Sequence, residues 1–291
     1  MTSLSTHAAK GIGSTLRLAS LGLAFAVAGY GTAAAAPSLF TFSPGGAGLT
    51  GTNVTADNLV LSNYSSVLFT GAASGGGVNF TESGFLPVVQ YQNGGTNVPN
   101  GGLNNTYSLF IQYSGSGTQG ASNVTSSVTS GSFSSLNYTL YGANGNVTYG
   151  FNGTTPTTSV NLATATVLAT GGLTSGTVVT QPQGGGAGFA PSATVNSVFT
   201  PASTAGGFFA APTPFYDLQF ASFINPSTTV SLLGSATSPG GFTITNGGGT
   251  ANFAATPVVV PPNPVPEPAS LTLLGLGLVG AAVARRRKLA V

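Results

Sequence analysis

Charged residues are nearly absent from this chain. Only 3% of its 291 residues are Asp, Glu, Lys or Arg, whereas an ordinary globular domain has roughly 25%. All six cations lie close to the two ends, and no Lys, Arg or His occurs between Val27 and Ala284. Such a body has no basic surface to neutralise phosphates, so the composition excludes nucleic acid as a partner.

Cysteine is absent as well, which excludes disulfides and thiolate metal sites. The only histidine, His7, lies in an N-terminal segment that we expect to be removed, so the mature chain lacks the most usual general base. The acids of the body are Asp57, Glu82 and Asp217. A glycoside hydrolase needs two carboxylates across the scissile bond, and no spacing here brings Glu82 together with either aspartate. The sequence therefore predicts a protein that is not an enzyme and has no cofactor.

Long helices are not expected in the body, because 44 glycines and abundant Ser, Thr and Asn favour turns. Instead, short runs alternate apolar and polar side chains with a period of two, which is typical of strands with one buried face. Such runs occur at residues 107–113, 136–140, 147–151 and 216–220. The pair Asn144 and Gly145 predicts a hairpin turn between strands at residues 133–141 and 146–151.

The glycine-rich segments are predicted to be loops. They lie at residues 71–77, 93–105, 171–176 and 183–188. In the last alternating run, Tyr216, Leu218 and Phe220 are expected to form the buried face. Antiparallel strands with one wet face pack as pairs of sheets. We therefore predict an all-β body at residues 36–255, with a β-sandwich or jelly-roll-like architecture and Gly-rich loops.

Residues 1–35 have the features of a secretory signal peptide, for which we expect a helix. Lys10 and Arg17 supply the cationic start, and an apolar stretch follows at residues 18–31. Ala33 and Ala35 are the small residues that a signal peptidase requires. These features predict export by the Sec machinery and cleavage by signal peptidase after Ala35.

The C-terminal segment, residues 265–291, has three parts in immediate succession. They are the turn Val265, Pro266, Glu267 and Pro268, an apolar run at residues 269–284, and the cations Arg285, Arg286, Arg287 and Lys288. At ~1.5 Å per residue the run makes a helix of about 24 Å, which spans the ~30 Å hydrocarbon core if Arg285 extends its charge to the interface. The cations should stay cytoplasmic, which places the body across the membrane. Residues 256–264 are rich in proline and predict an extended spacer.

This order of parts resembles the sorting segment of the PEP-CTERM proteins of Gram-negative bacteria. The resemblance implies processing by the membrane protease-transpeptidase exosortase, a transient stay in the inner membrane, and then a place at the cell surface or in the extracellular matrix. A plain tail anchor, which needs only a helix and cations, is the alternative. Residues 40–71 and 78–92 further resemble flocculation-associated members of this class. That second resemblance implies a secreted or surface protein that helps cells aggregate within exopolysaccharide.

Two functions remain open at this point. The first is a non-enzymatic surface or matrix protein that contributes to flocculation or biofilm formation through contacts with polysaccharide or with itself, since uncharged polar faces suit both. The second is a carbohydrate-binding or carbohydrate-active module, assisted by Ca²⁺ if Asp57 or Asp217 joins Asn and backbone oxygens. We favour the first, because the chain has no regular Asp/Asn spacing of a Ca²⁺ loop.

Overall fold

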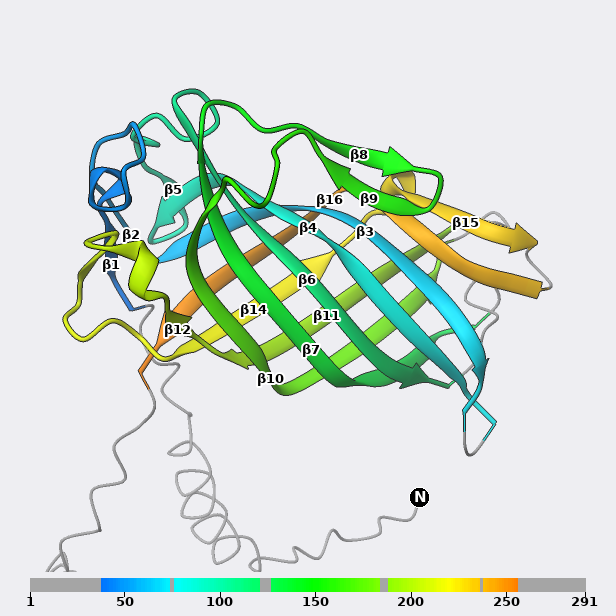
Figure 1. The fold of residues 1–291 in the computed structure, drawn as a ribbon. Coiled ribbons are helices and arrows are strands. Elements are labelled where there is room, and N and C mark those ends of the chain that lie inside the picture. Colours follow the sequence, from blue (N-terminus) through cyan, green and yellow to red (C-terminus); the bar gives the residue numbers. More distant parts are fainter. Residues whose placement is uncertain (1–37, 74–75, 121–126, 184–187, 236–237, 256–291) are drawn as a thin grey trace, which may run out of the picture.

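A computed structural model describes residues 38–73, 76–120, 127–183, 188–235 and 238–255 (Figure 1). The predicted signal helix, proline-rich spacer and transmembrane helix lie outside these ranges. Within them, no helix is long and apolar enough to cross a bilayer.

The main sheet has eleven strands, eight of which form a barrel. Their bounds are β3 (Asn58–Ala72), β4 (Val78–Asn93), β6 (Tyr107–Gln119), β7 (Thr129–Asn144), β10 (Thr166–Pro182), β11 (Phe189–Val198), β14 (Leu218–Ile224) and β16 (Ser238–Ala254). Short elements join or flank them: β1 (Phe40–Phe42), β2 (Val54–Ala56), β5 (Thr96–Asn97), β8 (Tyr149–Asn152), β9 (Thr155–Thr158), β12 (Thr200–Pro201), β13 (Phe209–Ala211), β15 (Val230–Ser235), and the 3₁₀ helices η1 (Pro44–Ala47), η2 (Ser203–Ala205) and η3 (Ser227–Thr229).

The strands close into a single barrel. They pair antiparallel in the order β11, β14, β16, β3, β4, β6, β7, β10, and β10 also pairs with β11, which completes the ring (Figure 1). The prediction of an all-β body is confirmed, whereas the predicted β-sandwich or jelly roll is wrong. Alternating side chains show which residues face the core, but a sandwich and a barrel share that pattern. The pairing of β10 with β11 closes the sheet into a barrel, and no local sequence pattern predicts this pairing.

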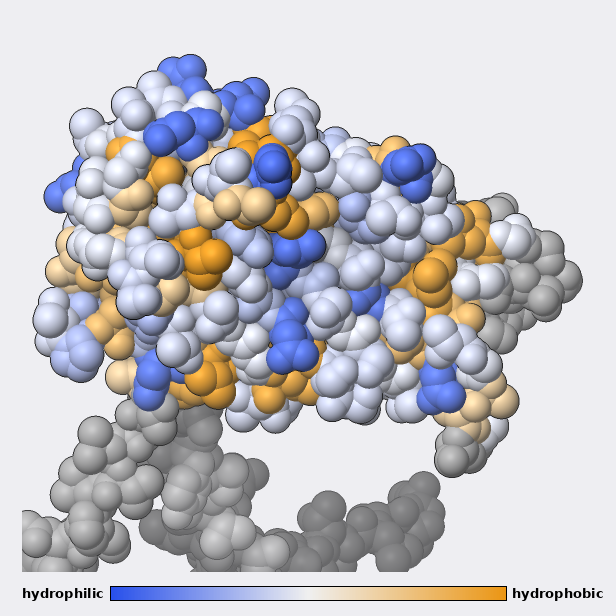
Figure 2. All heavy atoms as spheres, viewed as in Figure 1, coloured by the Kyte–Doolittle hydropathy of each residue, from blue (hydrophilic) through white to orange (hydrophobic). Residues whose placement is uncertain are grey.

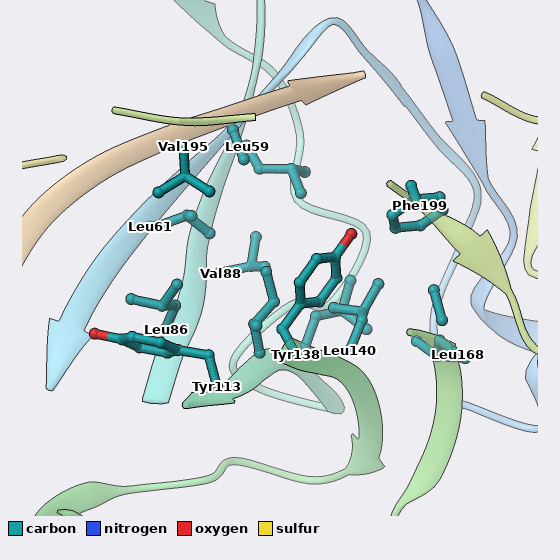
Figure 3. Close-up of a cluster of buried hydrophobic side chains, with 14 of the residues drawn as sticks. Leu59, Leu61, Leu86, Val88, Tyr113, Tyr138, Leu140, Leu168, Val195 and Phe199 are labelled. Atoms are coloured by element: carbon teal, nitrogen blue, oxygen red, sulfur yellow. The ribbon is translucent and has the colours of Figure 1, made fainter. Parts of the chain in front are cut away.

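The predicted apolar faces of two strands are confirmed. Tyr107, Leu109, Ile111 and Tyr113 of β6 are buried. On β7, the residues of the predicted apolar face, Leu136, Tyr138 and Leu140, are buried too. In Figure 3, side chains from different strands, Tyr138 among them, meet inside the barrel. The alternation therefore identified the inward face of both strands, but Ser108 and Phe110 of the opposite face of β6 are buried as well, Phe110 in a second, smaller hydrophobic cluster.

Glycine has a different role in these strands from the predicted one. Residues 171–176 lie within β10 and do not form a loop. Gly171 pairs with Tyr138, and a Cβ at Gly171 would overlap the Tyr138 ring. The same cross-strand pairing of a glycine with an aromatic residue joins Gly117 to Phe80 and Gly249 to Phe223. The missing side chains leave room for the rings that fill the interior.

Two other sequence-based predictions are wrong. Asn144 ends β7, and the following strand β8 pairs with β9 instead of folding back on β7. On β14, Phe220 is 37% exposed, whereas Gln219 is buried. The buried face of this strand is therefore the opposite of the predicted one. A shift of one residue in register exchanges the two faces of a strand, so a short run without strong neighbours is easily misassigned.

An aromatic cluster packs at the end of the barrel where β1 pairs with β2 and β13. Figure 1 shows β1 and β2 at this end. We call this aromatic cluster the plug, and it consists of Phe40, Phe42, Phe199, Phe208, Phe209, Phe215 and Phe253. Phe40 lies near the start of the described chain and Phe253 near its end, and their ring centroids are 5.1 Å apart. The two ends of the body therefore meet at the plug.

Candidate functional site

The interior of the barrel is mostly filled with side chains. It contains a cavity of about 80 Å³, lined mainly by apolar residues such as Leu61, Phe80, Ile111 and Phe133. Small-molecule sites usually measure ~300–1,000 Å³. An apolar cavity that binds benzene measures ~150 Å³. The described interior therefore has space for water but not for a sugar ring.

Glu82 is the acid of this interior. Tyr113 donates a hydrogen bond of 2.6 Å from its hydroxyl to Glu82 Oε1. The carboxyl has no cation to pair with, because Lys, Arg and His are missing from this part of the sequence. Burial raises the pKa of Glu82 above its ordinary value of 4.5, and the hydrogen bond from Tyr113 only partly opposes this. Burial thus shifts the ionisation of Glu82 toward the protonated form.

The substitution Glu82→Gln is expected to remove a pH dependence of stability. Because the pKa of Glu82 is higher in the folded than in the unfolded state, its stabilising contribution is complete below about pH 4.5 and is lost as the pH rises through the folded-state pKa. Glutamine stays neutral and can still accept the Tyr113 hydrogen bond. We expect the variant to be more stable than the wild type at neutral pH and its stability to vary less with pH. Denaturant unfolding of both mature proteins between about pH 4 and about pH 8 measures this, and parallel curves would contradict the role of Glu82.

Neither aspartate lies near Glu82. Asn58, next to Asp57, pairs with Gln92, ten residues along β4 from Glu82, which at ~3.3 Å per residue is roughly 33 Å. Asp57 is buried and its Oδ2 accepts a 2.7 Å hydrogen bond from the Gly94 amide, so it stabilises the turn after β4.

Asp217 precedes β14, which begins beside Ala254. Glu82 pairs with Val67 of β3, and Val67 pairs with Phe242 of β16. Phe242 is twelve residues along β16 from Ala254, so the distance between Glu82 and Asp217 also exceeds ~30 Å. A glycosidase needs its carboxylates within ~10 Å of each other. These acids therefore do not supply the pair considered above. The described residues also contain no group of three His, Cys, Asp or Glu side chains that could hold a metal ion. A calcium site built on a single aspartate stays a prediction.

The sequence contained a signal for the inward position of Glu82 that a residue-by-residue search missed. On β4, Phe80, Glu82 and Leu86 share one phase of the alternation. Phe80 and Leu86 are buried, so a period of two already places the Glu82 side chain among them. The contact of Glu82 with Tyr113 could not be predicted in this way, because it depends on the pairing of β4 with β6.

The other predicted site residues lie outside the described ranges. These are Ala33 and Ala35, Val265, Pro266, Glu267 and Pro268, and Arg285, Arg286, Arg287 and Lys288. The barrel nevertheless shows where the C-terminal segment attaches, because β16 ends at Ala254 next to the plug. The predicted sorting segment is therefore joined to the plugged end of the body.

Comparison with protein-family models identifies the PEP-CTERM protein-sorting motif at residues 264–288. The match begins one residue before Val265 and ends at Lys288, so it covers the three parts that the sequence analysis singled out. Comparisons with curated proteins and with solved structures gave no match.

Proposed function

Because this chain is a PEP-CTERM protein, and thus a secreted, exosortase-processed protein of the cell envelope, we propose that its barrel is a non-enzymatic component of the extracellular matrix. In this function it contributes to aggregation of cells with exopolysaccharide, as in flocculation or biofilm formation. Signal peptidase and exosortase process the precursor, and the C-terminal helix holds it in the membrane only until that step.

The observation that carries this proposal is the uncharged polar outer surface of the barrel. Side chains of Ser, Thr, Asn and Gln offer hydrogen-bond donors and acceptors without fixed charge. In Figure 2 the visible face is dominated by residues of near-neutral hydropathy, with separate small hydrophilic and hydrophobic spots. Low net charge also weakens repulsion between copies of a protein. A surface of this kind suits contacts in a dense matrix.

The filled interior also supports the proposal that the outer surface makes the contacts. The cavity of about 80 Å³ has no room for a sugar, and the acids lie far apart along the sheet. Contacts with a matrix must then be made by the outer walls of the barrel.

Deletion of the chromosomal gene tests the proposal in a host strain that flocculates. We expect the settled fraction of the culture to fall, and to recover when the wild-type gene is restored. A gene that ends before residue 265 is the matched control, because it encodes the barrel without the sorting segment, and we expect it not to restore settling. Unchanged settling after the deletion would rule out a role in flocculation.

A further inference from the structure

The outer face of β3, β4, β6 and β7 carries a hollow of about 290 Å³. Two rows of paired residues cross the four strands there. The first row is Ser66, Ser83, Ser114 and Asn137, and the second is Leu68, Thr81, Ser116 and Ser135. Neighbouring strands are ~4.8 Å apart, so each row is roughly 14 Å long. We call this set of eight residues the hydroxyl hollow.

A buried hydroxyl in the hollow is left without a partner. Ser66 is only 3% exposed. Its Oγ forms no hydrogen bond with any described residue. Leaving a buried polar group without a hydrogen-bond partner is unfavourable. The Oγ atom itself is buried, so a ligand in the hollow would reach it only after a change of the Ser66 rotamer, and would then supply the missing partner.

The other hydroxyls of the hollow keep free hydrogen-bonding capacity. Ser116 Oγ lies 2.8 Å from Ser135 Oγ and 3.2 Å from Ser134 Oγ. A hydroxyl has one donor and two acceptor positions, so this cluster is linked internally but not saturated. Leu68, which is 39% exposed, adds one apolar contact at the edge of the hollow.

The chemistry of the hollow identifies its ligand. Protein interfaces are enriched in aromatic residues, Met and Arg and depleted in Ser, so the lining is unlike a surface for another protein. An anionic polymer would need cations, and the sequence has none between Val27 and Ala284. Glu82 also borders the hollow. Its carboxyl, however, points into the barrel, where it accepts the hydrogen bond from Tyr113. Uncharged hydroxyl and amide groups match a ligand that is itself uncharged and rich in hydroxyls.

We propose that the hydroxyl hollow binds a neutral polysaccharide. This inference rests on the proposed matrix function and assigns it a surface. The volume is near the lower limit of the ~300–1,000 Å³ of small-molecule sites, which fits a short stretch of a chain that crosses the strands. The hollow lies on the side wall, since Ser66 is seven residues along β3 from Leu59, or about 23 Å from the end of the strand nearest the plug.

The test measures binding of the mature protein, purified from the host, to exopolysaccharide of the same host separated into neutral and acidic fractions. The variant Ser114→Leu places an apolar side chain in the middle of the hollow. Its matched control is Ser222→Leu, which changes another exposed serine, on β14 outside the hollow. Calorimetry gives the affinities, and melting curves check that both variants fold.

We expect the wild type to bind the neutral fraction more tightly than the acidic one. The affinity should fall at least about tenfold in Ser114→Leu and change less than about twofold in Ser222→Leu. Equal loss in both variants, no loss in either, or no binding of the neutral fraction by the wild type would overturn the inference. A change in self-association of Ser114→Leu without a change in polysaccharide binding would also overturn it, in favour of a protein partner.

These outcomes are independent of the deletion experiment. If the deletion abolishes flocculation but Ser114→Leu binds polysaccharide normally, the matrix function stands and the hollow is not its site. If flocculation is unchanged while Ser114→Leu loses binding, the hollow is a polysaccharide site and the proposed function fails.

Discussion

Replacement of Phe42 by alanine is expected to lower the free energy of unfolding by about 3–5 kcal/mol, as is typical for a fully buried phenylalanine. Phe42 is 0% exposed. Its ring contacts other aromatic rings at centroid distances from 4.7 to 6.2 Å, namely those of Phe40, Tyr91, Phe208, Phe209, Phe215 and Phe253. Truncation would open a cavity in the centre of the plug, and a total stability of ~5–15 kcal/mol leaves little reserve.

The same substitution at Phe220 is the control. This ring lies on the outer face of β14 and is 37% exposed, so its loss should cost less than about 1 kcal/mol. Thermal unfolding followed by circular dichroism compares the two variants. For a body of this size, Phe42→Ala should lower the melting temperature by about 6–20 °C. Similar melting temperatures for Phe42→Ala and Phe220→Ala would show that the plug does not stabilise the barrel.

Addition of one methyl group at Gly171 is expected to destabilise the barrel strongly. A Cβ at this position would overlap the Tyr138 ring and the Val198 carbonyl oxygen. The Tyr138 hydroxyl donates a 2.9 Å hydrogen bond to that carbonyl. The variant Gly171→Ala must displace the ring, at about 1–3 kcal/mol for overpacking, with another ~1–3 kcal/mol if the hydroxyl loses its partner.

Gly172 provides a control one residue away. A Cβ there would meet its nearest neighbours, Asn137 Oδ1 and the Leu136 carbonyl oxygen, at an ordinary 3.6 Å. Gly172→Ala should therefore be neutral or stabilise the protein by about 0.4–1 kcal/mol through a less flexible unfolded chain. Urea unfolding measures both variants. If Gly171→Ala were as stable as Gly172→Ala, the pairing of Gly171 with Tyr138 would not be needed to fill the interior.

Alternation of apolar and polar residues predicted the buried face of β6 correctly and that of β14 wrongly, for a physical reason. On β6, Leu109 and Ile111 lie in a long alternating run, and both are buried as predicted. On β14 the register with its neighbours buries Gln219 while Phe220 stays partly exposed. Cross-strand pairing outweighs the local pattern on this strand, whereas the equally short run at residues 136–140 of β7 was assigned correctly.

Glycine shows a second limit. Gly171 reads as a loop residue because its backbone is permissive, yet it lies within β10 opposite Tyr138. A glycine favoured for its missing side chain looks the same in sequence as one favoured for its backbone. The hydroxyl hollow was hidden for a related reason, since Ser66 and Asn137 are 71 residues apart in the chain and share one row only through β4 and β6.

The sorting motif could be predicted from contiguous residues, because residues 264–288 match it as one linear segment. The all-β character also follows from local alternation and composition. The closed barrel, the contact of Tyr113 with Glu82 and the hydroxyl hollow do not. Each depends on the register between strands far apart in the chain, and the free energy of such a pairing belongs to both strands together.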